Sequence, residues 1–103
     1  MTAEERDKRI TELFYADMEL LKRKGHDYSS DSDSLSNFRT WGFMGILVRM
    51  DDKIARLRNY AKGKVLQVQD EGVRDTMRDL RNYAFLAQVL LDEETHHERH
   101  NEV

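Results

Sequence analysis

Two aspartates one helical turn apart, Asp75 and Asp79, have the spacing that most directly suggests chemistry. Together with Asn82 they occupy positions i, i+4 and i+7, so a helix would place all three side chains on one polar line. Two carboxylates at this spacing can present oxygen atoms to Mg²⁺, which keeps its other positions for water and phosphates. The same spacing is also common on exposed helix faces, where basic neighbours such as Arg74 and Arg78 compensate the charge.

A second charged line precedes this one in the chain. Arg49, Asp52, Lys53 and Arg56 recur at steps of three and four residues, which places three cations and one carboxylate along one helix face. Arginine is suited to bidentate phosphate contacts, so the line predicts a phosphate-binding face with Asp52 as an additional metal ligand. A ladder of ion pairs within the helix explains the same pattern equally well, and each exposed pair contributes only roughly a few tenths of a kcal/mol.

Aromatic residues are concentrated around the polar segment 25–40. Connections of this length in compact domains are usually either functional or disordered. Tyr28, Phe38 and Trp41 have aromatic faces that can stack on a nucleobase. For Trp41 and Phe43, however, we favour a structural role in which they close the open end of a thin helical bundle.

Polar side chains of the same segment complete a possible nucleotide site. Asn37 has both a donor and an acceptor and can read the edge of a base. Asp27 can hold a ribose hydroxyl, a second cation or the loop itself. We therefore assign recognition of sugar and base to four residues: Asp27, Tyr28, Asn37 and Asn82.

Three segments carry the apolar period of amphipathic helices, and we predict helices over residues 2–24, 41–61 and 71–94. Thr2 and Glu5 match a capping box at the start of the first helix, and Gly25 is a natural stop. The expected core face of the second helix is Phe43, Leu47, Met50, Ile54, Leu57 and Ala61. The expected core face of the third helix is Val73, Met77, Leu80, Ala84, Ala87 and Leu91.

The composition agrees with an all-α protein. The chain has 103 residues, with 39% hydrophobic and 36% charged residues and neither proline nor cysteine, which favours helices with well-solvated outer faces. We predict an antiparallel bundle of three main helices in a single domain over residues 1–94, followed by a flexible polar tail over 95–103. Because so thin a bundle buries only a modest core, we expect a homo-oligomer to complete it.

Charge and hydropathy exclude several classes of partner. The net charge of −3 gives no sign of an extended nucleic-acid surface, so phosphate must be met by a local cluster of cations. No apolar run approaches the roughly 20 residues needed to span a bilayer, and the N-terminus is too charged for a secretory signal. We therefore expect a cytoplasmic protein with no membrane partner.

Three stretches in order, KGHDYSSDSDSLSNF, RMDDKIARLRNYAKGK and DEGVRDTMRDLRNYAFLAQVLLDEE, resemble the nucleotide modification associated domain family of short bacteriophage and bacterial proteins. The likeness covers residues 13–94 and rests on three motifs: Lys-x-x-Asp-Tyr, Arg-x-x-Asp-Lys-x-x-Arg and Asp-x-x-x-Asp-Leu-x-Asn-Tyr-Ala. It implies a protein associated with phage nucleotide metabolism or base modification, and hence a location in the host cytoplasm if the chain is phage-encoded.

The chain is also distantly similar to the all-α NTP pyrophosphohydrolases of the MazG and dimeric dUTPase type, which bind magnesium with carboxylates from facing helices. Asp75 and Asp79 match the second acidic motif of those enzymes. The expected Glu-x-x-Glu pair on the preceding helix is replaced here by Arg49-x-x-Asp52-Lys53, which lowers the number of acidic ligands. Asp17 or Glu19 of the first helix is a candidate replacement.

Three hypotheses follow for function. In the first, Asp52, Asp75 and Asp79 hold Mg²⁺ and are catalytic, and a (d)NTP is hydrolysed while its phosphates are bound by three cations: Arg49, Lys53 and Arg56. In the second, the same face belongs to a non-catalytic module that binds a nucleotide, a modified nucleotide or a protein, for example a phage anti-host or regulatory factor. In the third, the charged faces form an oligomer interface.

Overall fold

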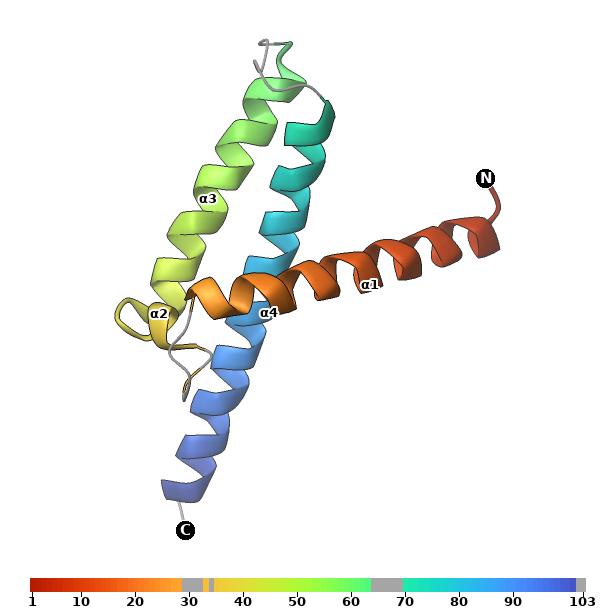
Figure 1. Cartoon of the computed structure of the whole chain (residues 1–103). Helices are drawn as coiled ribbons and strands as arrows, with labels where there is room; N and C mark the ends of the chain where they lie inside the picture. The colour runs from red at the N-terminus through yellow and green to blue at the C-terminus, as the bar shows by residue number, and fades with distance from the viewer. Residues whose placement is uncertain (29–32, 34, 64–69, 102–103) are drawn as a thin grey trace. The chain divides into compact units, whose positions relative to one another are not determined.

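A computed structural model describes residues 1–28, 33, 35–63 and 70–101. These residues form four helices and no strand: α1 (Ala3–Tyr28), α2 (Ser36–Arg39), α3 (Gly42–Ala61) and α4 (Asp70–Asn101) (Figure 1). The all-α prediction is confirmed for them. The chain divides into two compact units, Met1–Ser36 and Asn37–Val103. The antiparallel arrangement of three helices in one domain stays a prediction.

In the first unit, α1 begins with the predicted capping box. The backbone N–H of Glu5 donates to the Thr2 hydroxyl at 3.0 Å, and the N–H of Thr2 donates to the Glu5 carboxylate at 3.2 Å. The predicted end at Gly25 is wrong, because the helix continues to Tyr28. A glycine ends a helix where it adopts a left-handed conformation; inside a helix it costs only about 1 kcal/mol relative to alanine, and α1 is long enough to carry it.

In the second unit, α3 agrees with its predicted range to within one residue. Trp41 is the residue that precedes its first turn, and the helix ends at Ala61. Gly63 follows with φ of 76°, the left-handed conformation that favours glycine, and its N–H donates to the Tyr60 carbonyl at 3.0 Å. The predicted stop at Gly63 is therefore confirmed.

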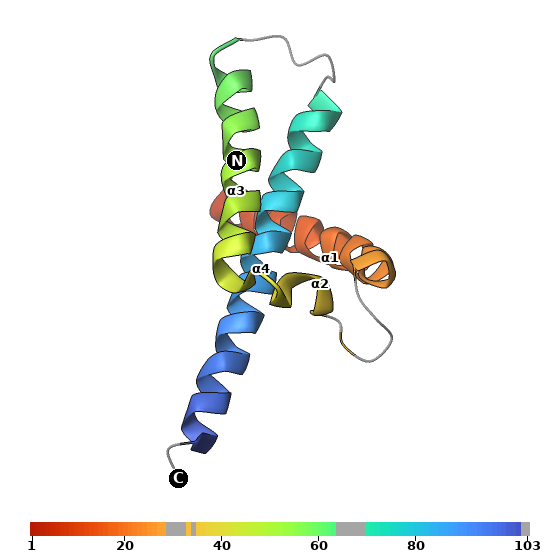
Figure 2. The same ribbon diagram turned by 90° about the vertical axis from the view of Figure 1, so that its left-hand side faces the viewer.

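Helices α3 and α4 pack against each other as an antiparallel hairpin (Figures 1 and 2). The Lys53 ammonium lies 3.2 Å from the Asp79 carboxylate, and one turn away the Arg49 guanidinium lies 6.0 Å from the centre of the Tyr83 ring. A step towards the C-terminus of α3 is thus matched by an equal step towards the N-terminus of α4. The predicted 41–61 and 71–94 segments are confirmed as neighbours.

The short helix α2 is joined to the same hairpin. The Arg39 guanidinium binds the Glu93 carboxylate of α4 through two parallel hydrogen bonds, one of which measures 3.1 Å. Phe38, next to Arg39, is only 4% exposed. The segment 25–40 was expected to lack helix, and this expectation is wrong for the last turn of α1 and for α2.

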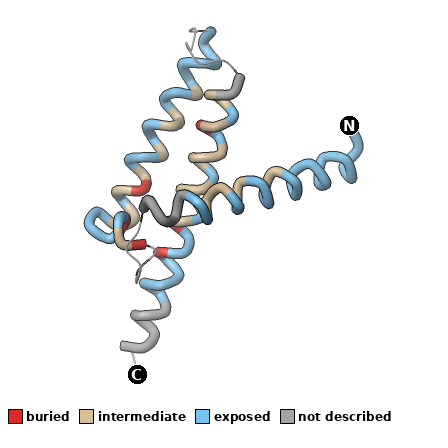
Figure 3. Tube along the Cα trace, in the orientation of Figure 1, coloured by how far each residue is buried: buried red, intermediate tan, exposed pale blue. Residues whose placement is uncertain are grey.

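The predicted core face of α4 is confirmed at Ala87, which is 5% exposed, and is wrong by one position at two other residues. Met77 and Leu91, which were expected in the core, are 51% and 40% exposed, whereas Leu90 is buried. Thr76 is also buried and donates from its hydroxyl to the Gly72 carbonyl at 2.7 Å, so its polar group carries no unpaired donor into the core. A threonine whose hydroxyl bonds to a carbonyl of its own helix can be buried, but its polar type predicts a surface position. Figure 3 shows the burial of each residue along the chain.

Helix α4 also extends beyond its predicted end at Glu94 and remains helical to Asn101. The segment after Glu94 lacks apolar periodicity, but periodicity is needed only where a helix packs, and charged residues are good helix formers. His96 and His100 lie on this extension, and their side chains are outside the described part of the structure. The flexibility of 95–103 stays a prediction, and the link 64–69 lies outside the described residues. None of the described helices combines the length and the apolar composition needed to cross a bilayer.

Adjacent leucines of α4 provide a test of this core face. Leu90→Ala should lower the free energy of unfolding by about 2–5 kcal/mol, because it leaves a cavity in the hairpin. Leu91→Ala removes the same atoms from a side chain that is 40% exposed and should cost less than about 1 kcal/mol. Urea denaturation followed by circular dichroism measures both, and a larger loss at Leu91 would contradict the observed face.

Candidate functional site

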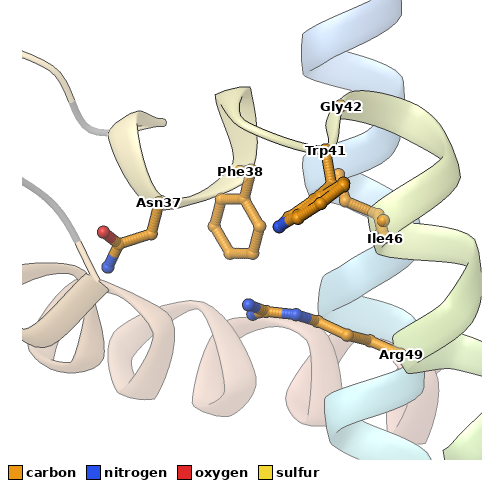
Figure 4. A pocket seen from close by; sticks show the side chains of 7 residues that line it. Asn37, Phe38, Trp41, Gly42, Ile46 and Arg49 are labelled. Atoms are coloured by element: carbon orange, nitrogen blue, oxygen red, sulfur yellow. The ribbon is translucent and has the colours of Figure 1, made fainter.

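A small surface pocket lies within the second unit, where α2 meets the first turns of α3 (Figure 4). Its volume is about 40 Å³, and it is lined by Asn37, Phe38, Trp41, Gly42, Gly45, Ile46 and Arg49. We call these seven residues the Trp41–Arg49 pocket. Ile46, which is 1% exposed, forms its apolar floor.

Arg49 contributes a cation to this pocket. Its guanidinium carbon lies 5.2 Å from the centre of the Phe38 ring and 6.0 Å from that of Tyr83. Both distances fit cation–π contacts, which hold the guanidinium in place without neutralising its charge. Within the described part of the chain, no carboxylate lies within ion-pair distance of Arg49, whose side chain is exposed.

Trp41 projects beside Arg49 and is 78% exposed. The structural role that we favoured for it, closing the end of the bundle, is therefore wrong: Phe38 occupies the buried position instead. The Trp41 indole and the Arg49 side chain both extend towards Phe38 (Figure 4). Since Phe38 is buried and already contacts the guanidinium, its expected stacking on a base is also not supported.

Two glycines allow this position of Trp41. Gly42 has φ of 58°, so the chain enters α3 through a left-handed residue. A side chain at position 45 would place its Cβ 2.5 Å from the Cβ of Trp41. That distance is too short for two carbon atoms, so only glycine fits at 45 while Trp41 keeps its place.

Of the four residues predicted to contact base and sugar, one lines the pocket. Asn37 is exposed and lines the pocket next to Phe38. Asn82 is half-buried on α4 and is not among the lining residues. Asp27 and Tyr28 belong to the last turn of α1, and their side chains lie outside the described part of the structure.

The other predicted phosphate ligands are paired with carboxylates. Lys53 binds Asp79 across the hairpin, with side chains that are only 16% and 27% exposed. Arg56 lies 3.4 Å from Asp52 in a pair at positions i and i+4 on α3, and both side chains are mostly exposed. The Arg56 pair therefore contributes little to stability, whereas the Lys53 pair is partly shielded from solvent.

The predicted magnesium ligands do not come together. Asp79 is paired with Lys53, Asp52 with Arg56, and Asp75 with Arg78 at 3.1 Å. Among the described residues, no three or more acidic or histidine side chains form a group that could hold a metal ion. In this arrangement the three aspartates do not fit the oxygen-rich shell that Mg²⁺ requires.

The sequence analysis singled out neither Gly42, Gly45 and Ile46, which line this pocket, nor Tyr83 beside it. Tyr83 contacts Arg49 from α4, and Gly45 makes room for Trp41. A glycine inside a strongly helical pattern, four residues after a tryptophan, was a usable signal, because an interior helical glycine often marks a close approach. Nothing in the local sequence indicates that Tyr83 faces Arg49.

Comparison with protein-family models, curated proteins and solved structures found no match to this chain. The resemblance to the nucleotide modification associated domain family and the distant similarity to MazG-type enzymes stay predictions. The function must therefore be argued from the geometry of the site.

The role of Gly45 can be tested directly. Gly45→Ala should displace Trp41, although alanine favours helix, and should shift the indole N–H resonance of this single tryptophan in an ¹H–¹⁵N NMR spectrum. Gly63→Ala adds the same methyl group at the other end of α3, where its strain comes from the left-handed backbone and not from a neighbouring side chain, and it should leave that resonance in place. Equal shifts in the two variants would contradict the steric argument.

Proposed function

We propose that this protein binds a nucleotide or modified nucleotide at the Trp41–Arg49 pocket as a non-catalytic module. The base stacks on the exposed face of the Trp41 indole, the Arg49 guanidinium binds phosphate, and Asn37 forms hydrogen bonds to base or sugar. The family resemblance of the sequence supports a place in phage or bacterial nucleotide metabolism, in the cytoplasm.

The observation that supports this proposal is the environment of Arg49, that is, its exposure and the groups that contact its guanidinium. Arg49 is an exposed residue whose guanidinium lies over the Phe38 ring at 5.2 Å and has no carboxylate partner among the described residues. An arginine held by aromatic rings keeps its full charge and its planar set of donors for an anion. An exposed indole beside it adds a flat apolar surface, and the two together suit a planar ring that carries a phosphate.

The size of the pocket defines how such a ligand lies. A cavity of about 40 Å³ is far below the roughly 300–1,000 Å³ of enclosed ligand pockets. A base therefore stacks on the outer surface of Trp41 and does not enter the pocket. Binding of this kind buries little area, so we expect affinities in the micromolar to millimolar range.

The alternative of a Mg²⁺-dependent pyrophosphohydrolase requires Asp52, Asp75 and Asp79 to leave their cations and gather around a metal. The sequence similarity supports this alternative, while their ion pairs with Arg56, Arg78 and Lys53 oppose it. The two functions differ in two observables, because the binding module retains its ligand in EDTA and releases no product.

Nucleotide binding can be measured through the single tryptophan. Titration with nucleotides in EDTA should quench its fluorescence, and Arg49→Gln should weaken binding roughly tenfold, as expected for loss of a charge-assisted contact. Arg58→Gln is the matched control, since Arg58 is also exposed on α3 but does not line the pocket, and it should change affinity less than about twofold.

Three results would count against the binding module. Absence of quenching by every nucleotide, or equal losses in Arg49→Gln and Arg58→Gln, would show that the pocket is not the site. Phosphate or pyrophosphate released from a (d)NTP with Mg²⁺, and abolished by Asp79→Asn, would establish the hydrolase instead.

We also propose that the protein forms a homo-oligomer through the outer face of α3. Met44 and Val48, one turn apart and 67% and 62% exposed, form an apolar strip with no cover among the described residues. Val48→Lys should lower the mass measured by sedimentation equilibrium to that of one chain, whereas Arg58→Gln should not. A wild-type chain that sediments as a monomer at all concentrations would contradict this assembly.

A further inference from the structure

We infer that the ligand of the Trp41–Arg49 pocket is a nucleoside monophosphate and not a triphosphate. This inference rests on the proposed function and specifies it, because it assigns the number of phosphates that the site can accept. It depends on which cations along α3 are available and which are already neutralised.

Only one charge is available at the pocket itself. Among the described residues that line it, Arg49 alone is charged, and its ring contacts leave that charge unneutralised. One guanidinium can form two parallel hydrogen bonds to one phosphate group. A phosphate bound there is therefore satisfied by a single residue.

The next cation along α3 is not free. Lys53 lies one turn beyond Arg49, but its ammonium is 3.2 Å from the Asp79 carboxylate and its side chain is only 16% exposed. A second phosphate that drew Lys53 away would leave the half-buried Asp79 carboxylate without this partner. Removing one partner from a shielded pair is costly, so Lys53 does not serve a longer phosphate chain.

A carboxylate also lies beyond Arg49 on α3, where a longer phosphate chain would extend. Asp52 lies three residues after Arg49, with a side chain 62% exposed, and pairs with Arg56 at 3.4 Å. The five groups Arg49, Asp52, Lys53, Arg56 and Asp79 hold three cations and two carboxylates, leaving one net positive charge. Phosphates added beyond the first gain no free cation and approach Asp52, which repels them.

Affinity as a function of phosphate number tests this inference. The full-length protein in EDTA is titrated with the four ribonucleosides, their 5′-monophosphates and their 5′-triphosphates, and the fluorescence of Trp41 is followed. For the best-bound base, we expect the monophosphate to bind about tenfold more tightly than the nucleoside, and the triphosphate to bind no more tightly than the monophosphate.

A pair of neighbouring variants isolates the role of Asp52. Asp52→Asn should raise triphosphate affinity relative to monophosphate affinity by about fivefold, because it removes the carboxylate beside the phosphate chain. Asp51→Asn makes the same change in net charge one residue away, on a different side of the helix, and should leave that ratio within about twofold.

The possible outcomes separate this inference from the proposed function. A triphosphate that binds tenfold more tightly than the monophosphate overturns the inference and keeps the nucleotide module. Equal affinities for nucleoside and monophosphate overturn it as well, since Arg49 would then not bind phosphate. If no nucleoside or nucleotide quenches Trp41, the proposed function itself fails and the inference fails with it.

Discussion

The half-buried ion pair between Lys53 and Asp79 is the contact on which the geometry of the second unit depends. It favours a single register of α3 against α4. A shift of one residue would separate the Lys53 ammonium from the Asp79 carboxylate and leave both charges unpaired in a partly desolvated interface. With this register, Arg49 lies opposite Tyr83 one turn away, and Arg39 reaches Glu93 further along α4. Few apolar side chains are buried among the described residues of the hairpin, so this ion pair contributes to the specificity of the pairing.

The folded structure also gives three basic residues of α3 two different kinds of partner. Lys53 is paired with Asp79 of α4 and Arg56 with Asp52 of its own helix, whereas Arg49 contacts two aromatic rings and no carboxylate among the described residues. This difference decides which of three similar cations can bind an anion. An aromatic ring orients a guanidinium as a carboxylate does, but it does not compete with phosphate for the same donors.

The exposed indole of Trp41 has its own structural cause. The left-handed Gly42 and the absence of a side chain at Gly45 allow Trp41 to lie against the start of α3, while Phe38 fills the buried position below it. A large apolar ring that is 78% exposed has little to contribute to the stability of the unit. In the proposed function it provides a flat surface for recognition beside the Arg49 guanidinium.

The sequence by itself located α1, α3 and α4 and predicted that α3 and α4 are neighbours, but it predicted neither α2 nor the ends of α1 and α4. Apolar periodicity located α3 to within one residue and the capping box located the start of α1, because these signals depend on neighbours in the chain. Two of the predicted ligand-binding residues, Asn37 and Arg49, line the same pocket, and their binding role stays a prediction. The tertiary structure alone decided which face of α4 is buried. It also paired Lys53 with Asp79 and left Arg49 between two rings. The spacing of charged residues along one helix is the same whether they hold a metal, grip a phosphate or neutralise each other. The folded geometry determines which partner each of them meets, on the opposite helix for Lys53 and Asp79 and on its own helix for Asp52 and Asp75.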